Sequence, residues 1–136
     1  MTNRYFVLIL GESTGVECLK SLLKLNFINI KYVISANKIY NFILKKICNK
    51  NNIIFYDLKN FRKKKIKIQN NKTEEFILLS IFSNLILKKD FLKQFKNRSY
   101  NIHPGLLPFY PGKNCVSGAI YNLEKKTGVT LHLMTK

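Results

Sequence analysis

Asn101 and His103 are the two residues whose types and spacing could support chemistry. They fall at the end of residues 98–102, a segment with the pattern of a short strand, and side chains two apart on a strand point to the same side. We therefore expect an amide and an imidazole next to each other. Such a pair can donate hydrogen bonds to an oxygen that gains negative charge, and the imidazole can move protons near neutral pH.

The loop that follows this strand has an unusual composition. Residues 101–112 contain all three prolines, two of the six glycines and one of the two histidines. Proline stiffens the backbone and glycine permits tight turns, so this composition predicts a loop of definite shape. Pro104 has no backbone N–H to donate and should end the strand. In open α/β sheets, ligands bind at the carboxyl ends of the strands, which makes this loop the candidate site.

The first half of the chain alternates between strand and helix patterns. Short apolar segments typical of strands lie at residues 5–10, 29–34 and 53–56. Between them we expect two helices, one capped by Ser13 or Thr14 and one over residues 39–48. The apolar face of the second helix should consist of Ile39, Phe42, Ile43 and Ile47. This βαβαβ order predicts a parallel, right-handed, Rossmann-like sheet.

The second half continues the alternation. Residues 76–82 are the most apolar segment and should form the central strand. Helices are expected over residues 88–95 and 114–123, and a last strand over residues 129–134. The sequence therefore predicts one α/β domain over residues 1–136, with a mostly parallel sheet flanked by helices.

The chain is strongly basic, with a formal net charge of +17 from 24 Lys and Arg against 7 Asp and Glu. Such a charge can attract nucleic acid or phosphorylated substrates. The charge is spread along the chain, however, and a genome rich in A/T codons also enriches lysine, asparagine and isoleucine. The dense basic run at residues 59–72 can be interpreted as a nucleic-acid contact or, more simply, as a solvated connection.

The cysteines and the apolar start of the chain indicate where the protein works. Cys18, Cys48 and Cys115 are odd in number and widely spaced, which favours a reducing compartment with neither a disulfide framework nor a metal-binding pattern. The apolar run at residues 5–10 is too short for a signal peptide or a membrane span. We therefore expect a cytoplasmic protein with no membrane partner.

Several common chemistries have no support in the sequence. Gly11 and Gly15 are only a weak match to a dinucleotide fingerprint, and no GxGxxG, P-loop, CxxC, HExxH or GxSxG motif occurs. With only seven carboxylates, the sequence gives little support to a hydrolase that uses two acidic residues. The asparagine and histidine pair is what remains.

Ordered motifs in the second half resemble a known family. They are Asn101-x-His103-Pro-Gly-Leu-Leu-Pro108, Tyr110-x-Gly112, Ala119-Ile-Tyr-Asn122 and Thr127-Gly-Val-Thr-x-His-x-Met134. Together they resemble the folate-dependent formyltransferases, which include methionyl-tRNA, glycinamide ribonucleotide and nucleotide-sugar formyltransferases. The likeness covers residues 76–136, and before that it consists only of the alternation of elements.

The resemblance implies a Rossmann-like domain that carries a formyl group from 10-formyltetrahydrofolate to an amine. It places the family's catalytic asparagine and histidine on Asn101 and His103. The implied folate contacts are Gly105, where the family has serine, Leu106, Leu107 and Pro108, together with Phe82, Leu85 and Leu87 from a preceding strip. The acceptor amine stays open among tRNA-linked methionine, a nucleotide amino sugar and glycinamide ribonucleotide.

The resemblance also implies a catalytic aspartate, in a Leu-Asp-x-Gly motif, at a position beyond Lys136. That carboxylate would hold and polarise the histidine. We therefore expect little or no formyl transfer from these 136 residues alone, and transfer by a longer version. Two other functions stay open: a catalytically inactive folate- or partner-binding remnant, and a basic RNA-binding module centred on residues 62–72.

Single residues also have simpler interpretations. Taken alone, His103 would be a structural histidine in a turn, but the residues around it favour catalysis. His132 lies in an alternating strand pattern and is expected to pack or to face solvent. Cys115 is better explained as a small buried residue than as an activated thiol. Phe109 and Tyr110 could stack on a ligand or cover the core equally well.

Overall fold

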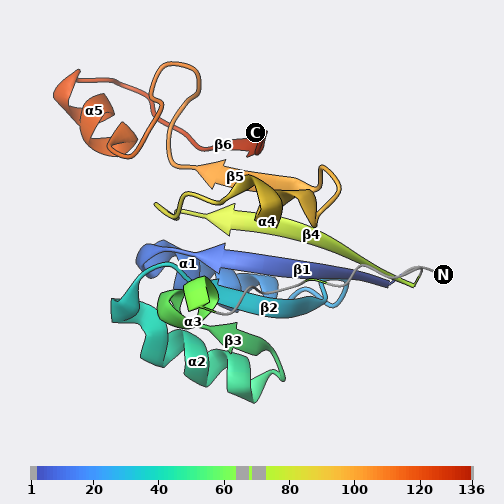
Figure 1. The fold of residues 1–136 in the computed structure, drawn as a ribbon. Coiled ribbons are helices and arrows are strands. Elements are labelled where there is room, and N and C mark those ends of the chain that lie inside the picture. Colours follow the sequence, from blue (N-terminus) through green and yellow to red (C-terminus); the bar gives the residue numbers. More distant parts are fainter. Residues whose placement is uncertain (1–2, 64–67, 69–72, 136) are drawn as a thin grey trace.

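A computed structural model describes residues 3–63, 68 and 73–135, which form a six-stranded sheet (Figure 1). The strands are β1 (Asn3–Leu10), β2 (Ile30–Ser35), β3 (Ile54–Tyr56), β4 (Glu74–Ile81), β5 (Ser99–His103) and β6 (Thr130–Leu133). Their order is β3-β2-β1-β4-β5-β6, with β1 to β5 parallel and β6 antiparallel to β5. The predicted Rossmann-like α/β fold with a mostly parallel sheet is confirmed.

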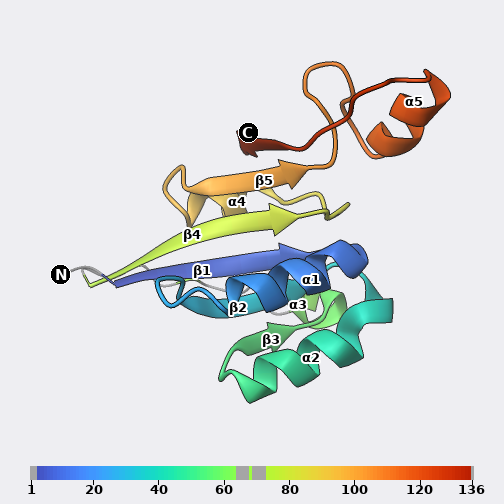
Figure 2. The ribbon, with the colours of Figure 1, turned by 180° about the vertical axis from the view of Figure 1, so that it is seen from behind.

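The helices cover both faces of this sheet. They are α1 (Glu12–Leu22), α2 (Asn41–Lys50), α3 (Leu58–Lys63), α4 (Lys89–Lys93) and α5 (Cys115–Tyr121), with a 3-10 turn, η1 (Lys38–Tyr40), before α2. Side chains of α1 and α2 pack on one face, while those of α3 and α4 pack on the other (Figures 1 and 2). In both views α5 lies beyond β5 and β6, outside these layers.

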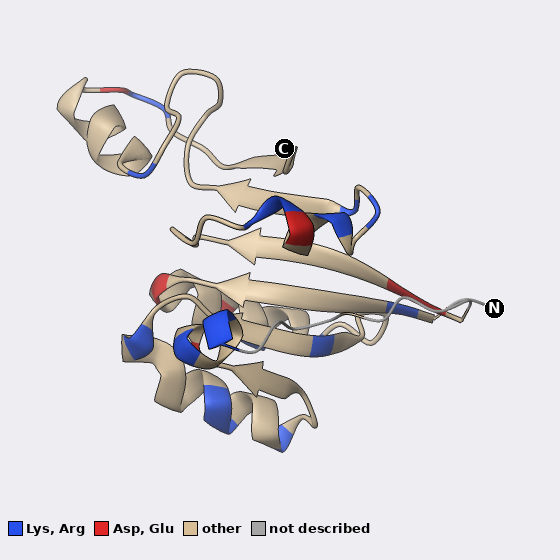
Figure 3. Ribbon diagram, viewed as in Figure 1, with Lys and Arg blue, Asp and Glu red and all other residues tan. Residues whose placement is uncertain are grey.

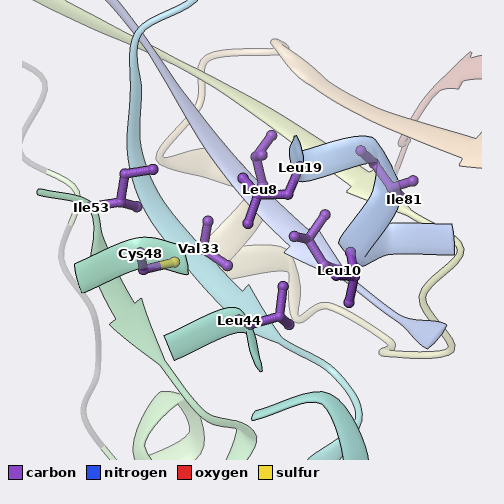
Figure 4. Close-up of a cluster of buried hydrophobic side chains, with 9 residues drawn as sticks. Leu8, Leu10, Leu19, Val33, Leu44, Cys48, Ile53 and Ile81 are labelled. Carbon is purple, nitrogen blue, oxygen red and sulfur yellow. The ribbon is translucent and has the colours of Figure 1, made fainter. Parts of the chain in front are cut away.

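Strand β1 is the centre of the core, because both of its faces are covered. Leu8 and Leu10 point to the layer of α1 and α2, and Val7 and Ile9 point to the opposite layer. All four are at most 1% exposed, and burying each side chain contributes about 1.5–3 kcal/mol. Figure 4 shows the first of these clusters, in which Leu8, Leu10, Leu19, Val33, Leu44, Cys48, Ile53 and Ile81 meet. A continuous apolar run is what such a strand requires.

Helix α1 begins at Glu12, so the predicted cap at Ser13 or Thr14 is wrong. The capping position is Gly11, and no side-chain hydrogen bond closes this helix end. Gly11 instead lies against the end of β4, where its N–H donates to the carbonyl oxygen of Ile81 over 3.0 Å. A Cβ at Gly11 would overlap the carbonyl oxygen of Phe82. Close packing of β1 against β4 therefore determines where α1 starts.

The predicted inner face of the second helix is largely wrong, because of its four residues only Ile47 packs against the core. Ile39 and Phe42 are 74% and 83% exposed, whereas Leu44 and Cys48 are the buried residues of α2. Residues 39–48 hold apolar side chains at two overlapping helical spacings, so periodicity alone does not say which set is buried. The 3-10 turn shifts the start of the helix to Asn41, and the stripe with Leu44 and Cys48 then faces the sheet.

The basic residues are distributed over several elements. Figure 3 shows Lys and Arg on α2, α3 and α4 and near strand ends, in agreement with the spread of charge along the sequence. Of the basic run at residues 59–72, α3 ends at Lys63, and Ile68 is buried with its N–H donating to Gln94 Oε1 over 2.7 Å. Residues 64–67 and 69–72 lie outside the described residues. None of the helices in the described ranges is long and apolar enough to cross a membrane.

Candidate active site

Strand β5 places Asn101 and His103 on the same side, where both line one cleft of about 350 Å³. This cleft, called the polar cleft below, is bordered by the segments that follow β1, β4 and β5 and by the start of α5. Its lining residues are Glu12, Thr14, Phe82, Ser83, Asn84, Asn101, Ile102, His103, Pro104 and the run from Gly112 to Ser117. It lies at the carboxyl ends of parallel strands, the expected position for ligands in this architecture.

A second cleft of about 330 Å³ lies on the other side of Asn101. This apolar cleft is lined by Ser83, Leu85, Ile86, Leu87, Leu92, Asn101, His132, Leu133, Met134 and Thr135. Two residues, Ser83 and Asn101, line both clefts. Asn101 therefore stands where the polar cleft and the apolar cleft meet.

His132 orients the amide of Asn101. The two residues are register partners across β5 and β6, and Asn101 Nδ2 lies 3.1 Å from His132 Nε2. The other ring nitrogen, His132 Nδ1, lies 3.1 Å from the carbonyl oxygen of Leu133, which can only accept. His132 therefore carries its proton on Nδ1, and its Nε2 accepts a hydrogen bond from Asn101. The remaining amide hydrogen of Asn101 stays free for a ligand.

His103 is held by a backbone carbonyl. Its side chain is buried, with the residue 8% exposed, and its Nε2 lies 2.7 Å from the carbonyl oxygen of Tyr110. The two histidine rings are 6.5 Å apart between centroids, at an angle of 72°. Asn101 thus has one imidazole as its hydrogen-bond partner and a second imidazole nearby on its own strand.

Thr130 ties the loop between Gly105 and Leu107 to β6. Its hydroxyl donates to the carbonyl oxygen of Gly105 over 2.7 Å and accepts from the N–H of Leu107 over 3.1 Å. One side chain thus satisfies two backbone groups of the loop, which keeps them from being left without partners. The position of the loop therefore depends on the pairing of β6 with β5.

The predicted folate contacts fall into two groups. Leu85 and Leu87 line the apolar cleft, and Phe82 lines the polar one. The loop group, Gly105, Leu106, Leu107 and Pro108, is not among the described residues that line either cleft. Leu106 and Pro108 are exposed, Leu107 is half-buried and Gly105 is buried. The role of these loop residues as folate contacts stays a prediction.

Two residues at the site were not identified from the sequence. His132 was expected to pack or face solvent, but it contacts Asn101 on the neighbouring strand. Glu12 enters the polar cleft from the start of α1, with a φ of 50°, which is uncommon for a residue with a side chain. The sequence gives only a weak indication of either residue. The position of His132 depends on how β5 pairs with β6, and that of Glu12 depends on how β1 packs against β4.

Electrostatics around the loop centre on Tyr110. Its hydroxyl donates to Glu124 Oε1 over 2.6 Å, and this hydrogen bond to a carboxylate raises the pKa of Tyr110 above its ordinary value. Cys115 is 3% exposed at the first position of α5, as expected for a small buried residue. The described residues contain no group of three or more His, Cys, Asp or Glu side chains arranged to hold a metal ion.

Comparisons with known proteins point to one family. The family model for formyl transferases matches residues 4–136. Bifunctional polymyxin resistance protein ArnA of Wigglesworthia glossinidia brevipalpis is 35% identical over 127 residues, which cover 90% of this chain and 19% of that protein. Methionyl-tRNA formyltransferase of Mycoplasma capricolum is 31% identical over 150 aligned positions, covering 100% of this chain and 45% of that protein. The chain thus spans less than half the length of these curated relatives.

Solved structures support the same fold. Phosphoribosylglycinamide formyltransferase from Brucella melitensis superposes with a TM-score of 0.67 and 22% identity, over 99% of this chain and 74% of that one. A formyltetrahydrofolate deformylase from Pseudomonas syringae gives a TM-score of 0.71 at 16% identity, over 99% of this chain and 47% of that one. Because the family model extends over nearly the whole chain, this protein belongs to the formyl transferase family.

Proposed function

We propose that this chain carries the active site of a formyltransferase, which moves a formyl group from 10-formyltetrahydrofolate to an amine of an acceptor. The observation that carries the proposal is the position of Asn101 between the two clefts, with His103 on the polar side. A transfer between two substrates requires that they meet at one group. Membership of the formyl transferase family supports this reaction class.

The apolar cleft suits the folate. Leu85, Leu87 and Leu92 line it, together with the polar side chains of Asn101 and His132. Ligand sites of this size commonly combine an apolar lining with a few polar groups that set orientation. A flat pteridine against the leucines would bring the formyl-bearing end of the folate toward Asn101.

Asn101 and His103 would divide the chemistry. As the acceptor nitrogen attacks the formyl carbon, the formyl oxygen gains negative charge, and the free amide hydrogen of Asn101 can donate to it. One such preorganised donor lowers the barrier by roughly 3–4 kcal/mol. The attacking amine must lose a proton and the departing folate nitrogen must gain one. His103 can serve both steps, because an imidazole takes and gives protons near neutral pH.

The acceptor would occupy the polar cleft. Glu12, Lys113 and Asn114 line it and can form hydrogen bonds and ion pairs with a polar substrate. Relatives are named for tRNA-linked methionine, GDP-perosamine and phosphoribosylglycinamide, and we propose an acceptor amine from this range. We further propose that residues 1–136 belong to a single catalytic domain. All three cysteines are unpaired, which fits work in the cytoplasm.

The test measures folate binding and formyl transfer separately. We expect the chain to bind 10-formyltetrahydrofolate, and a longer version that contains this chain to transfer the formyl group to at least one of the three acceptor classes. His103→Ala should lower turnover by orders of magnitude and leave the folate Kd nearly unchanged. Unchanged turnover would refute the role of His103.

Two other results would point to the other functions. Folate binding with no transfer in any form of the protein would identify a binding remnant. RNA affinity that falls steeply with salt, without folate binding, would favour the basic module at residues 62–72.

A further inference from the structure

The proton on His103 has a defined position. Its Nε2 lies 2.7 Å from the carbonyl oxygen of Tyr110. A carbonyl oxygen can only accept a hydrogen bond, so the ring nitrogen facing it must carry a hydrogen. In the neutral imidazole the lone pair then resides on Nδ1. This is the opposite tautomer to that of His132, whose Nδ1 faces the carbonyl oxygen of Leu133.

Tyr110 is itself anchored by its side chain. The phenol donates to Glu124 Oε1 over 2.6 Å and accepts from Asn122 Nδ2 over 3.3 Å. Both partners lie just after α5, and the N–H of Glu124 donates to the carbonyl oxygen of Ala119 over 3.0 Å. The phenol therefore ties the Tyr110 end of the loop to the end of α5, while the carbonyl of the same residue faces His103.

Gly105 leaves space for the hydrogen bond between His103 and the Tyr110 carbonyl. A Cβ at this position would lie 3.1 Å from His103 Nε2 and 3.1 Å from the Tyr110 carbonyl oxygen, the two atoms of the hydrogen bond. It would also lie 2.9 Å from Cys115 Cβ. In this chain a Cβ at position 105 would press on the donor and the acceptor together, and both would have to shift by a few tenths of an ångström to admit it.

We propose that Gly105, Tyr110 and Glu124 are positioning residues that fix His103 as the Nε2–H tautomer, so that Nδ1 is the atom that exchanges protons with the substrates. The catalytic part of this inference rests on the proposed function, while the tautomer itself does not. Glu124 acts through the phenol of Tyr110, Tyr110 acts through its carbonyl, and Gly105 acts by leaving space.

The proton steps balance with this assignment. As the acceptor nitrogen bonds to the formyl carbon, its N–H bond breaks and an Nδ1–H bond forms, which gives an imidazolium that still donates from Nε2 to the Tyr110 carbonyl. When the bond between the formyl carbon and the folate nitrogen breaks, that nitrogen takes the Nδ1 proton. The ring then returns to its starting tautomer, and Nε2 keeps its hydrogen throughout.

The chain offers an internal comparison for the test, because it contains only two histidines. Nitrogen-15 NMR of histidine-labelled protein, at a pH where both rings are neutral, should show His103 protonated on Nε2 and His132 protonated on Nδ1. The Nε2 hydrogen of His103 should exchange slowly with water. His132→Asn assigns the signals. A proton on Nδ1 of His103 would overturn the proposal.

Variants of the three residues sharpen the test. In Gly105→Ala, the slowly exchanging Nε2–H signal should disappear. Because the added Cβ also meets Cys115, the double variant with Cys115→Gly relieves that contact and should still lose the signal. Persistence of the signal in both folded variants would remove Gly105 from the proposal.

The anchoring phenol has a matched control. Tyr110→Phe should speed exchange of the His103 Nε2–H and lower turnover by about 10–100-fold, the cost of a small misplacement at a reacting group. Tyr121→Phe makes the same change at a tyrosine that is 88% exposed and should alter neither. Glu124→Ala should behave like Tyr110→Phe, and Glu124→Gln, which keeps an acceptor for the phenol, should restore slow exchange.

The outcomes separate this inference from the proposed function. The predicted tautomers without formyl transfer would leave the positioning network intact and refute the formyltransferase proposal. Formyl transfer by a Tyr110→Phe variant with unchanged turnover and unchanged exchange of the His103 Nε2–H would refute the positioning network and leave the formyltransferase proposal intact.

Discussion

Different interactions stabilise two regions of this molecule, one around β1 and β4 and one around α5 and β6. Around β1 and β4, side chains such as Leu8 and Phe76 are at most 1% exposed and pack between layers. Around α5 and β6, Ile120, Leu123 and Leu131 are 70%, 86% and 63% exposed, and hydrogen bonds connect the segments. The region around β1 and β4 is a scaffold that apolar burial stabilises. The region around α5 and β6, called the site region below, is arranged by polar contacts.

The largest expected effect tests this contrast directly. Leu8→Ala removes a fully buried side chain from the scaffold and should lower the free energy of unfolding by about 2–5 kcal/mol. Leu131→Ala makes the same change on β6, where the side chain is largely exposed, and should change the free energy of unfolding by no more than about 0.5 kcal/mol. Urea unfolding followed by circular dichroism measures both. Equal losses would show that burial stabilises both regions alike.

A charged pair in the scaffold gives a smaller effect with a defined pH dependence. Lys31 Nζ on β2 lies 2.8 Å from Glu74 Oε1 on β4, and 4.7 Å from the centre of the Tyr5 ring. The hydrogen bond to Glu74 raises the pKa of Lys31. A raised lysine pKa stabilises the fold below the unfolded value of about 10.4 and loses this contribution as the pH rises through the folded value. Lys31→Gln should cost about 0.5–1 kcal/mol at pH 7.

The matching control for this pair lies on the surface of α1. Lys20 Nζ is 2.7 Å from Glu17 Oε1, but both side chains are substantially exposed. Lys20→Gln should cost only about 0.2–0.5 kcal/mol. The difference between wild type and Lys31→Gln should stay constant from pH 7 to 9 and shrink at higher pH. A cost that grows with pH would contradict the assigned sign.

The scaffold was the more predictable half, for physical reasons. The strands β1 and β4 lie at the centre of the sheet, so their apolar runs are continuous and visible in sequence. The face of α2 was not predictable, because Leu44 and Cys48 compete with Phe42 and Ile43 at similar helical spacings. Which stripe is buried depends on where the helix begins, and a 3-10 turn decides that.

The site region was predictable only where chemistry depends on local spacing. Asn101 and His103 share a side because they are two apart on one strand, a rule that needs no tertiary information. The contact between Asn101 and His132 depends on antiparallel register between distant segments, and the entry of Glu12 depends on the packing at Gly11. The catalytic roles stay predictions, because geometry shows position and not turnover.

The last experiment measures thiol reaction rates, and no change in the free energy of unfolding is expected. It tests whether the scaffold and the site region open separately. Cys48 in the scaffold and Cys115 in the site region are both buried, and burial raises the pKa of Cys48 to about 12. A thiol must be exposed and ionised to react, so reaction with an aromatic disulfide reagent reports opening. In a Cys18→Ala background, Cys115 should react through local opening of the short helix α5, well before Cys48.

Combining this labelling with Leu8→Ala turns the contrast into a measurement. If Cys48 is exposed only by global unfolding, the variant should speed its reaction by the same factor by which it lowers the equilibrium constant for folding. Cys115 should keep its rate, because opening of α5 leaves the cluster around Leu8 intact. Equal acceleration at both cysteines would mean that one cooperative unit includes the site. The hydrogen bonds that position His103 would then draw their stability from the core and not from the loop alone.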